Sequence, residues 1–374
     1  MDGTMEERYM QSKRQANFEL LRIVAMLMII VLHYLNKSNL LLLFTQEQTA
    51  VNYVMHLIVA FCIVAVNCYV LLSGYFMVES AWKPGRVVSL AAQILFYSLL
   101  IPVVLIVAGV VPADDLSVYD WLHYVLPIET EHYWFATAYL IMYVLAPILA
   151  AGVKMVGKRT LQIVIAVLLL YFSVWKSFIP VSFATDRYGY EYGWFVCLFL
   201  IAAYLRLYGC PFLEKKRNAA LLYAGMSLGI FLLAAASGIM SEVIHPLSYY
   251  MDMPTTYNHI LCLFGSIGLF MLFKDMKPWE GKAAEAVRRL APYTFGVYLL
   301  HEHELVRYQW MKWLHVDSVW GRWMFIPHMI GSVLLVYAVG TAVDFARAWI
   351  FKGVVKRTGR MKMQNKADDS GLKR

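Results

Sequence analysis

Long apolar runs recur along the whole chain, and they constrain its fold more than any other feature. A helix needs about 20 mostly apolar residues to cross a bilayer. Ten runs are long enough, namely 17–36, 53–77, 87–110, 133–151, 160–179, 192–209, 218–240, 257–274, 290–307 and 324–350. Of the 374 residues, 60% are hydrophobic and 16% are charged, which is typical of a membrane protein and not of a soluble domain. We therefore expect an all-α polytopic bundle with about ten transmembrane helices.

Basic residues gather at every second connection between these runs. They are Lys13, Arg14, Lys83, Arg86, Lys154, Lys158, Arg159, Lys215, Lys216, Arg217, Lys274, Lys277, Lys282, Arg288, Arg289 and those of the tail after 351. The connections between them carry few basic residues and several acidic ones. Because basic residues favour the cytoplasmic side of a membrane, the alternation predicts a multi-pass plasma-membrane protein with both termini in the cytoplasm.

Little of the chain lies outside these runs. We expect a cytoplasmic segment over 1–16, a transmembrane domain over 17–351, and a basic, disordered cytoplasmic tail over 352–374. The basic charge of the tail suits contact with anionic membrane lipid, and we expect no nucleic-acid partner. The five cysteines lie in or beside apolar runs without the spacing of a metal site, so we expect no metal.

The first apolar run carries two polar side chains that a membrane helix rarely tolerates without a function or a partner, Arg22 and His33. They are eleven residues apart, which is roughly 16 Å along a helix and close to whole turns, so both lie on one face. A structural explanation is also open. Arg22 and His33 could each extend to the nearest headgroups, and Glu19 could pair with Arg22 one turn away.

Several motifs resemble the acyltransferase 3 family of bacterial membrane acyltransferases. Arg22, ten intervening residues and His33, within "ELLRIVAMLMIIVLHY", resemble the first helix of that family. The stretches "VNCYVLLSGYF" (66–76), "HYWFATAYLIMYVLAPIL" (132–149), "YGWFVCLFLIAAYLRLYG" (192–209) and "PYTFGVYLLHEH" (292–303) are similar to further family segments in the expected order. The resemblance covers about residues 17 to 350. The form "WFATAY" is similar to a small Gram-positive branch, and we expect no C-terminal esterase-like domain.

The resemblance implies an enzyme that moves an acyl group, most simply acetyl, from cytoplasmic acyl-coenzyme A to a hydroxyl of a cell-envelope or exported glycan at the outer face. His33 is the expected general base, because an imidazole pKa near 6.5 suits proton removal at neutral pH. It could instead accept the acyl group as a nucleophile. Arg22 is expected to orient the donor or stabilise developing negative charge. His301 and Glu302 are further catalytic candidates on the same side as His33, although a plain surface cluster explains them equally well.

Binding residues for donor and acceptor follow from the same division. Cations near the inner surface are expected to hold the phosphates of coenzyme A, and the candidates are Arg22, Lys83, Arg86 and Arg206. The acceptor candidates are Trp134, Tyr139, His132 and Ser73. Anchoring at the membrane interface explains Trp134 as well, and close helix packing at "Ser-Gly" explains Ser73.

Two other classes of function fit ten spans with intramembrane charges. One is a transporter or flippase, which often shows two related halves; no such repeat is visible here. The other is a non-catalytic sensing module of the same architecture, which would not need to keep a base at His33. Acyl transfer, present or absent, separates the enzyme from both.

Overall fold

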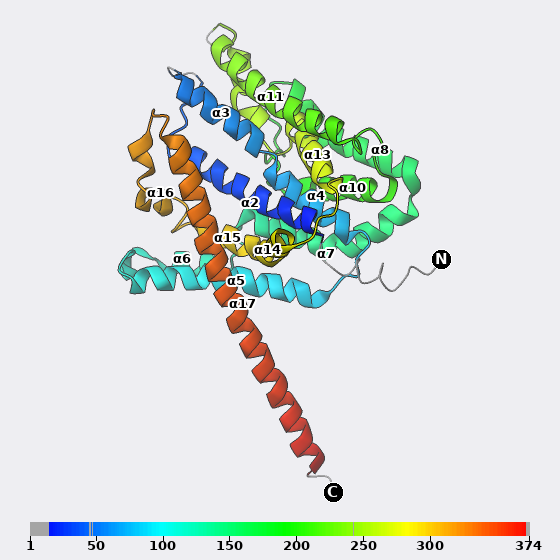
Figure 1. The fold of residues 1–374 in the computed structure, drawn as a ribbon, viewed down its shortest axis with the longest axis vertical. Helices are drawn as coiled ribbons and strands as arrows, with labels where there is room; N and C mark the ends of the chain where they lie inside the picture. Colours follow the sequence, from blue (N-terminus) through cyan, green and yellow to red (C-terminus); the bar gives the residue numbers. More distant parts are fainter. Residues whose placement is uncertain (1–14, 45, 47, 242, 372–374) are drawn as a thin grey trace.

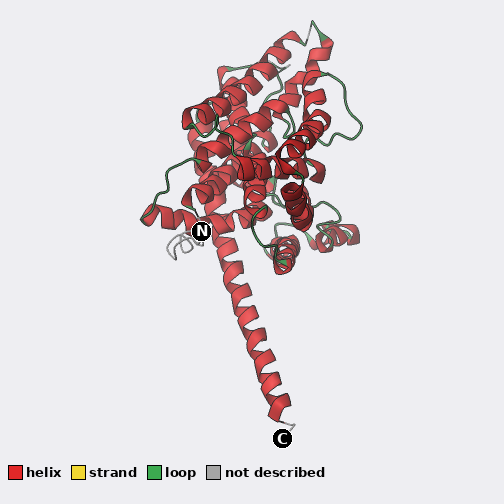
Figure 2. Cartoon of the chain, turned by 90° about the vertical axis from the view of Figure 1, so that its right-hand side faces the viewer, coloured by secondary structure: helices red, strands yellow, loops and turns green. Residues whose placement is uncertain are grey.

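The computed structural model describes residues 15–44, 46, 48–241 and 243–371, and this part of the chain is helical with no strand (Figure 2). The helices are α2 (Ala16–Lys37), α3 (Ala50–Cys62), α4 (Ala65–Met77), α5 (Pro84–Val107), α6 (Val118–Val125), α7 (Trp134–Met155), α8 (Gly157–Leu169), α9 (Trp175–Phe178), α10 (Tyr192–Tyr208), α11 (Lys216–Met240), α12 (Tyr249–Asp252), α13 (Ile260–Lys274), α14 (Lys282–Leu290), α15 (Thr294–His301), α16 (Gln309–Trp313) and α17 (Phe325–Gly371). The prediction of an all-α fold is confirmed.

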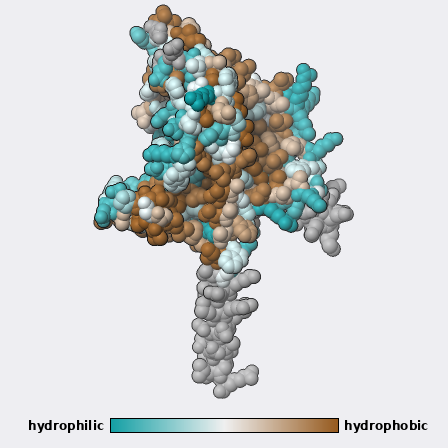
Figure 3. Space-filling view, turned by 60° about the vertical axis from the view of Figure 1, so that its left-hand side comes forward, coloured by the Kyte–Doolittle hydropathy of each residue, from teal (hydrophilic) through white to brown (hydrophobic). Residues whose placement is uncertain are grey.

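Among the described residues, eight helical segments are long and apolar enough to cross a membrane. They are Ala16–Lys37, Ala50–Met77, Pro84–Val107, Trp134–Met155, Gly157–Phe178, Lys216–Met240, His245–Lys274 and Phe325–Gly353. α10 is a shorter apolar helix, and most of its residues are buried. Large apolar side chains are exposed on α5, α8, α11 and α17, where lipid would meet them, and Figure 3 shows a broad apolar area on one flank. The cytoplasmic placement of both termini stays a prediction.

α2 lies inside the bundle, against α3, α4, α13, α14, α15 and α17 (Figure 1). Its apolar residues face more than one side, which is typical of a helix that is buried rather than amphipathic. Leu21, Ile30, Tyr34 and Leu35 are fully buried. The helix that carries Arg22 and His33 is therefore surrounded mainly by protein, and this limits the access of both side chains to the lipid headgroups.

The ninth expected span, residues 290–307, is not one continuous helix. α14 ends at Leu290, a short turn contains Pro292, and α15 is only eight residues long. Proline removes a backbone donor and disfavours an uninterrupted helix, and eight residues rise about 12 Å, which is too short to cross a bilayer. The polar cluster that begins at His301 therefore lies at the end of a short internal helix.

The two ends of the chain differ from each other in the structure, because the C-terminal end is described as helix as far as Gly371. The expected cytoplasmic segment 1–16 lies almost wholly outside the described residues. The backbone of residues 352–371 continues α17 beyond the bundle as helix, where the sequence leads us to expect a disordered tail (Figure 1). The boundaries of the transmembrane domain stay predictions.

α11 and α13 pack closely through Gly268. A Cβ atom at this position would lie 2.7 Å from the backbone nitrogen of Tyr223 and 2.9 Å from the carbonyl oxygen of Ala219. We expect Gly268→Ala to force these helices apart and to lower the free energy of unfolding by about 1–3 kcal/mol. Thermal unfolding in detergent measures the change. Gly229→Ala at the same helix pair is the control, since its Cβ would meet Leu261 only at 3.6 Å. Equal melting temperatures for the two variants would contradict this account.

Candidate active site

His33 belongs to a buried polar cluster between α2 and the end of α15. Its Nδ1 atom lies 3.0 Å from Nε2 of His301 and 3.2 Å from Oε2 of Glu302. Glu302, which is 5% exposed, caps the carboxyl end of α15. The structure thus brings together three of the four residues predicted to be catalytic, although His33 and His301 are 268 positions apart in the sequence.

The hydrogen bonds indicate which nitrogen of His33 is free. Nδ1 of His301 lies 2.6 Å from the carbonyl oxygen of Val297, so this nitrogen donates. In a neutral His301, Nε2 is then an acceptor. Nδ1 of His33 faces this acceptor and the carboxylate of Glu302, so it is the donor. Nε2 of His33 is left with its lone pair, and no described residue forms a hydrogen bond with it. It is the nitrogen able to take a proton from a substrate.

Two cations hold the carboxylate of Glu302. Nζ of Lys37 lies 2.6 Å from Oε1 and 2.5 Å from Oε2, and Nη1 of Arg307 lies 3.8 Å from Oε1. A buried carboxylate needs such partners, because transfer of an unpaired charge out of water is strongly unfavourable. Neither cation was among the residues predicted for the site. The signal for Lys37 was available, since it lies four residues after His33 and therefore on the same helix face.

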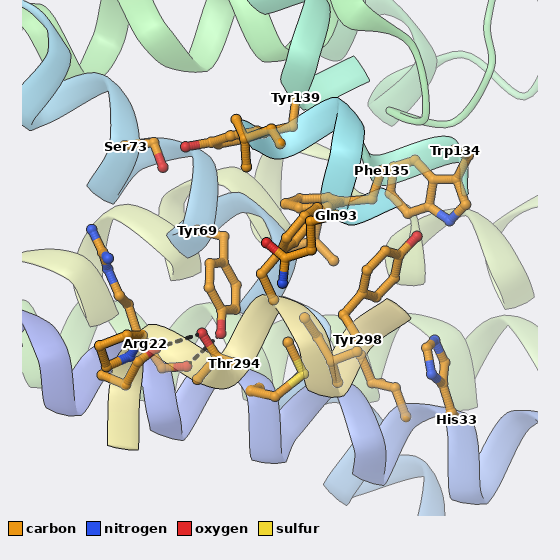
Figure 4. A pocket seen from close by; sticks show the side chains of 18 of the residues that line it. Arg22, His33, Tyr69, Ser73, Gln93, Trp134, Phe135, Tyr139, Thr294 and Tyr298 are labelled. Carbon is orange, nitrogen blue, oxygen red and sulfur yellow. Dashed lines mark hydrogen bonds between the residues drawn. The ribbon is translucent and has the colours of Figure 1, made fainter. Parts of the chain in front are cut away.

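A cavity of about 1170 Å³, open solvent at its mouth included, extends along α2 from Arg22 to His33. Figure 4 shows these two side chains at opposite ends, with Gln93 and Tyr298 between them. Three of the predicted acceptor residues line this cavity, namely Ser73, Trp134 and Tyr139. Gln93, Thr294 and Tyr298 also line it, and none of them was predicted from the sequence.

A second cavity adjoins the first at its Arg22 end. The two share Arg22, Ser73, Arg86 and Tyr139, and the second adds Lys83 and Lys154. We call the four cations of this region, Arg22, Lys83, Arg86 and Lys154, the basic vestibule. No acidic residue of the described chain lines either cavity. Together the cavities form a passage that is positively charged at one end and reaches His33 at the other.

Two predicted site residues lie elsewhere. Arg206 forms an ion pair with Glu79 and lies over the ring of Tyr75, and it lines neither cavity of the described chain. His132 packs edge-on against Tyr133, with 4.5 Å between ring centroids. Burial, and then the nearby positive charge of Arg307, lower the pKa of His132 to about 4, so it is neutral near pH 7.

The ligand atoms of His33, His301 and Glu302 lie within 4.8 Å of one another, which raises the question of a metal ion. Two observations show that these atoms already have partners. The two imidazoles are at hydrogen-bond distance, and Lys37 contacts both oxygens of Glu302. These atoms do not favour a metal ion, because Lys37 would have to give up its contacts with Glu302 before the carboxylate could bind one. The expectation of no metal stays a prediction.

Comparison with known proteins gives one finding. A family model described as an acyltransferase domain matches residues 15–344, which include every residue of the passage and of the His33 cluster. No curated protein and no solved structure matches the chain.

Proposed function

Because the chain belongs to the acyltransferase 3 family and is thus a membrane acyltransferase, we propose that it transfers an acetyl group from acetyl-coenzyme A to a glycan hydroxyl. One observation carries this proposal. A basic vestibule leads through a cavity to the free nitrogen of the half-buried His33. A donor with an anionic head and a long neutral arm that ends in a thioester matches this sequence of environments.

The donor enters from the vestibule. The phosphates of coenzyme A bind the vestibule cations, since charge-assisted hydrogen bonds to phosphate are among the strongest in proteins. Arg22 lies at this end of the cavity, well away from His33 (Figure 4). Its role is therefore to hold and orient the donor. The pantetheine arm follows the cavity along α2 and places the thioester beside His33.

The reaction at His33 is general-base catalysis. Nε2 removes the proton of the acceptor hydroxyl, and the oxygen attacks the thioester carbonyl carbon. The carbon–sulfur bond then breaks, and the thiolate leaves with the proton from His33. Nδ1 of His33 donates to Nε2 of His301, and the carboxylate of Glu302, 3.2 Å from Nδ1, stabilises the imidazolium that forms between these steps. Both partners thus contact the same nitrogen of His33 and leave Nε2 to face the substrate.

The acceptor approaches the His33 end of the passage. The ring of Trp134 is stacked on that of Tyr257, with centroids 5.6 Å apart, and both line the cavity. Flat aromatic faces suit the apolar face of a sugar ring. With the vestibule on the cytoplasmic side, as the alternation of basic residues predicts, the acceptor is a cell-envelope or exported glycan of a bacterium at the outer face.

The test is acetyl-coenzyme A turnover by the purified protein in nanodiscs, followed by thiol release with pooled envelope glycans as acceptors. Acceptor-dependent release together with an acetylated glycan is the expected result. Failure to bind acetyl-coenzyme A at millimolar concentration would overturn the proposal and favour a transporter or a sensing module.

The vestibule cations act on donor binding and not on the chemical step. We expect Arg86→Gln combined with Lys154→Met to raise KM for acetyl-coenzyme A about 10-fold or more, because two charge-assisted contacts are lost, while kcat changes little. Initial rates at several salt concentrations measure this, and the salt dependence of KM should weaken in the variant. Arg206→Gln is the matched control outside the passage. An equal rise of KM in the control would contradict the assignment.

A further inference from the structure

Gln93 on α5 stands between the cavity and a buried carboxylate on α17. Its side chain lines the cavity, and its Nε2 atom donates to Oδ1 of Asp344 at 2.9 Å. Figure 4 shows Gln93 between the Arg22 end and the His33 end. Neither the proposed chemistry nor the vestibule uses this residue, yet it lies on the path of the donor arm.

Asp344 is fully buried and has partners for both oxygens. Tyr97 donates to its Oδ1 at 2.9 Å, and Nε of Arg347 donates to the same oxygen at 2.6 Å. Arg347 also donates to Oδ2 at 3.2 Å and balances the charge. α15 approaches so closely here that a Cβ atom at Gly296 would overlap the carboxyl group of Asp344. The carboxylate is therefore held in one place.

This arrangement fixes which end of the Gln93 amide faces the cavity. An ionised carboxylate only accepts hydrogen bonds, so the NH2 group of Gln93 must point to Asp344. The carbonyl oxygen, Oε1, is then turned away from Asp344. It has no hydrogen-bond partner among the described residues, and it is not fully buried. Since the side chain lines the cavity, this oxygen faces the open space there.

We propose that Oε1 of Gln93 accepts a hydrogen bond from an amide N–H of the pantetheine arm, and that Asp344 is the positioning residue that aims it. This inference rests on the proposed function, because it names the part of the donor that Gln93 recognises. A pantetheine arm has two amide N–H groups, and each loses its water when the arm enters the cavity. A donor left without an acceptor there is costly.

Two hydroxyl groups that line the cavity with Gln93 already donate hydrogen bonds within the protein. The hydroxyl of Tyr69 donates to the carbonyl oxygen of Arg22 at 2.6 Å, and that of Thr294 donates to the carbonyl oxygen of Ala291 at 3.0 Å. The carbonyl of Gln93 differs from these hydroxyls, because it can only accept a hydrogen bond and Asp344 fixes its direction. It suits an N–H donor and offers nothing to a phosphate, which is itself an acceptor.

The experiment compares donors with and without amides. Gln93→Met keeps the length of the side chain and removes the acceptor. We expect kcat/KM to fall about 10-fold with acetyl-coenzyme A and with acetyl-pantetheine, and to stay within about 2-fold with S-ethyl thioacetate, which has no amide. An equal change with all three donors, or no change with any, would overturn the inference alone. A native protein that uses none of the donors would overturn the proposed function with it.

Asp344→Asn and Tyr97→Phe separate positioning from folding. The asparagine amide in the first variant offers a donor as well as an acceptor, so the Gln93 amide is no longer held one way, and we expect the same donor-dependent loss in kcat/KM. Tyr97→Phe removes another hydrogen bond of Asp344 and leaves the one from Gln93, so its loss should not depend on the donor. Melting temperatures report the structural cost of each. A donor-dependent loss in Tyr97→Phe, or none in Asp344→Asn, would contradict the positioning role.

Discussion

Replacement of His33 by glutamine is expected to lower kcat for acetyl transfer by about 10²–10⁴-fold, the range that a general base contributes. Glutamine keeps a polar side chain of similar length and removes the basic nitrogen. The Kd for acetyl-coenzyme A should change little, because the phosphates bind at the other end of the passage. Thiol release gives kcat, and calorimetric titration of the donor gives Kd.

The mass of the native protein decides between the two roles open to His33. A base leaves no acetyl group on the protein when the donor is present without an acceptor, whereas a nucleophile would carry one, visible as added mass on the peptide that contains His33. His56→Gln is a matched control on α3, where the ring nitrogen contacts the carbonyl oxygen of Leu42 at 2.8 Å. A native kcat in His33→Gln would exclude both roles.

Glu302→Gln should be the most destabilising change in the cluster. It removes the negative charge that balances Lys37 and Arg307, and the loss of one partner from a buried ion pair typically costs about 3–5 kcal/mol. Activity should fall as well, because the imidazolium of His33 loses its stabilising carboxylate. Thermal unfolding and thiol release measure the two effects. Glu304→Gln, at a side chain that is 38% exposed, should change the melting temperature little.

A second substitution separates stability from activity. Lys37→Met added to Glu302→Gln removes the unbalanced ammonium group, so we expect the double variant to regain much of the lost stability while it stays poorly active. A double variant no more stable than Glu302→Gln would mean that the carboxylate is not held by Lys37. A double variant with native activity would mean that Glu302 has no part in catalysis.

Helix periodicity was enough to relate Arg22 to His33. Eleven residues bring two side chains to one helix face, and both do line the same cavity. The same periodicity places Lys37 on the helix face of His33. A lysine at the end of an apolar run, however, is also typical of an anchor at the membrane interface. Only the partner, Glu302, distinguishes the two cases, and that carboxylate comes from a segment 265 positions away.

Hydropathy averages could not show where a span is interrupted. The run 290–307 is apolar enough to cross a membrane, yet Pro292 and the short α15 end it inside the bundle. The expected position near the inner surface grouped Arg206 with Lys83 and Arg86 as candidates for binding the donor phosphates. The sequence alone could not show that Arg206 forms an ion pair with Glu79, or that Lys154 at the end of α7 lines the vestibule. Gln93 and Asp344 are 251 positions apart, and such a pairing needs the packed helices.

The depth of the passage has an electrical consequence. We expect water and ions in the vestibule to carry the potential of their own side inward along α2, so that the protein beyond His33 is the insulating layer that remains. The transmembrane voltage then falls across a short distance, and one elementary charge moved through 100 mV corresponds to about 2.3 kcal/mol. A proton taken up at His33 lies at the edge of this layer. We therefore expect the rate in sealed vesicles to depend on membrane potential, although no net charge crosses the bilayer in the reaction.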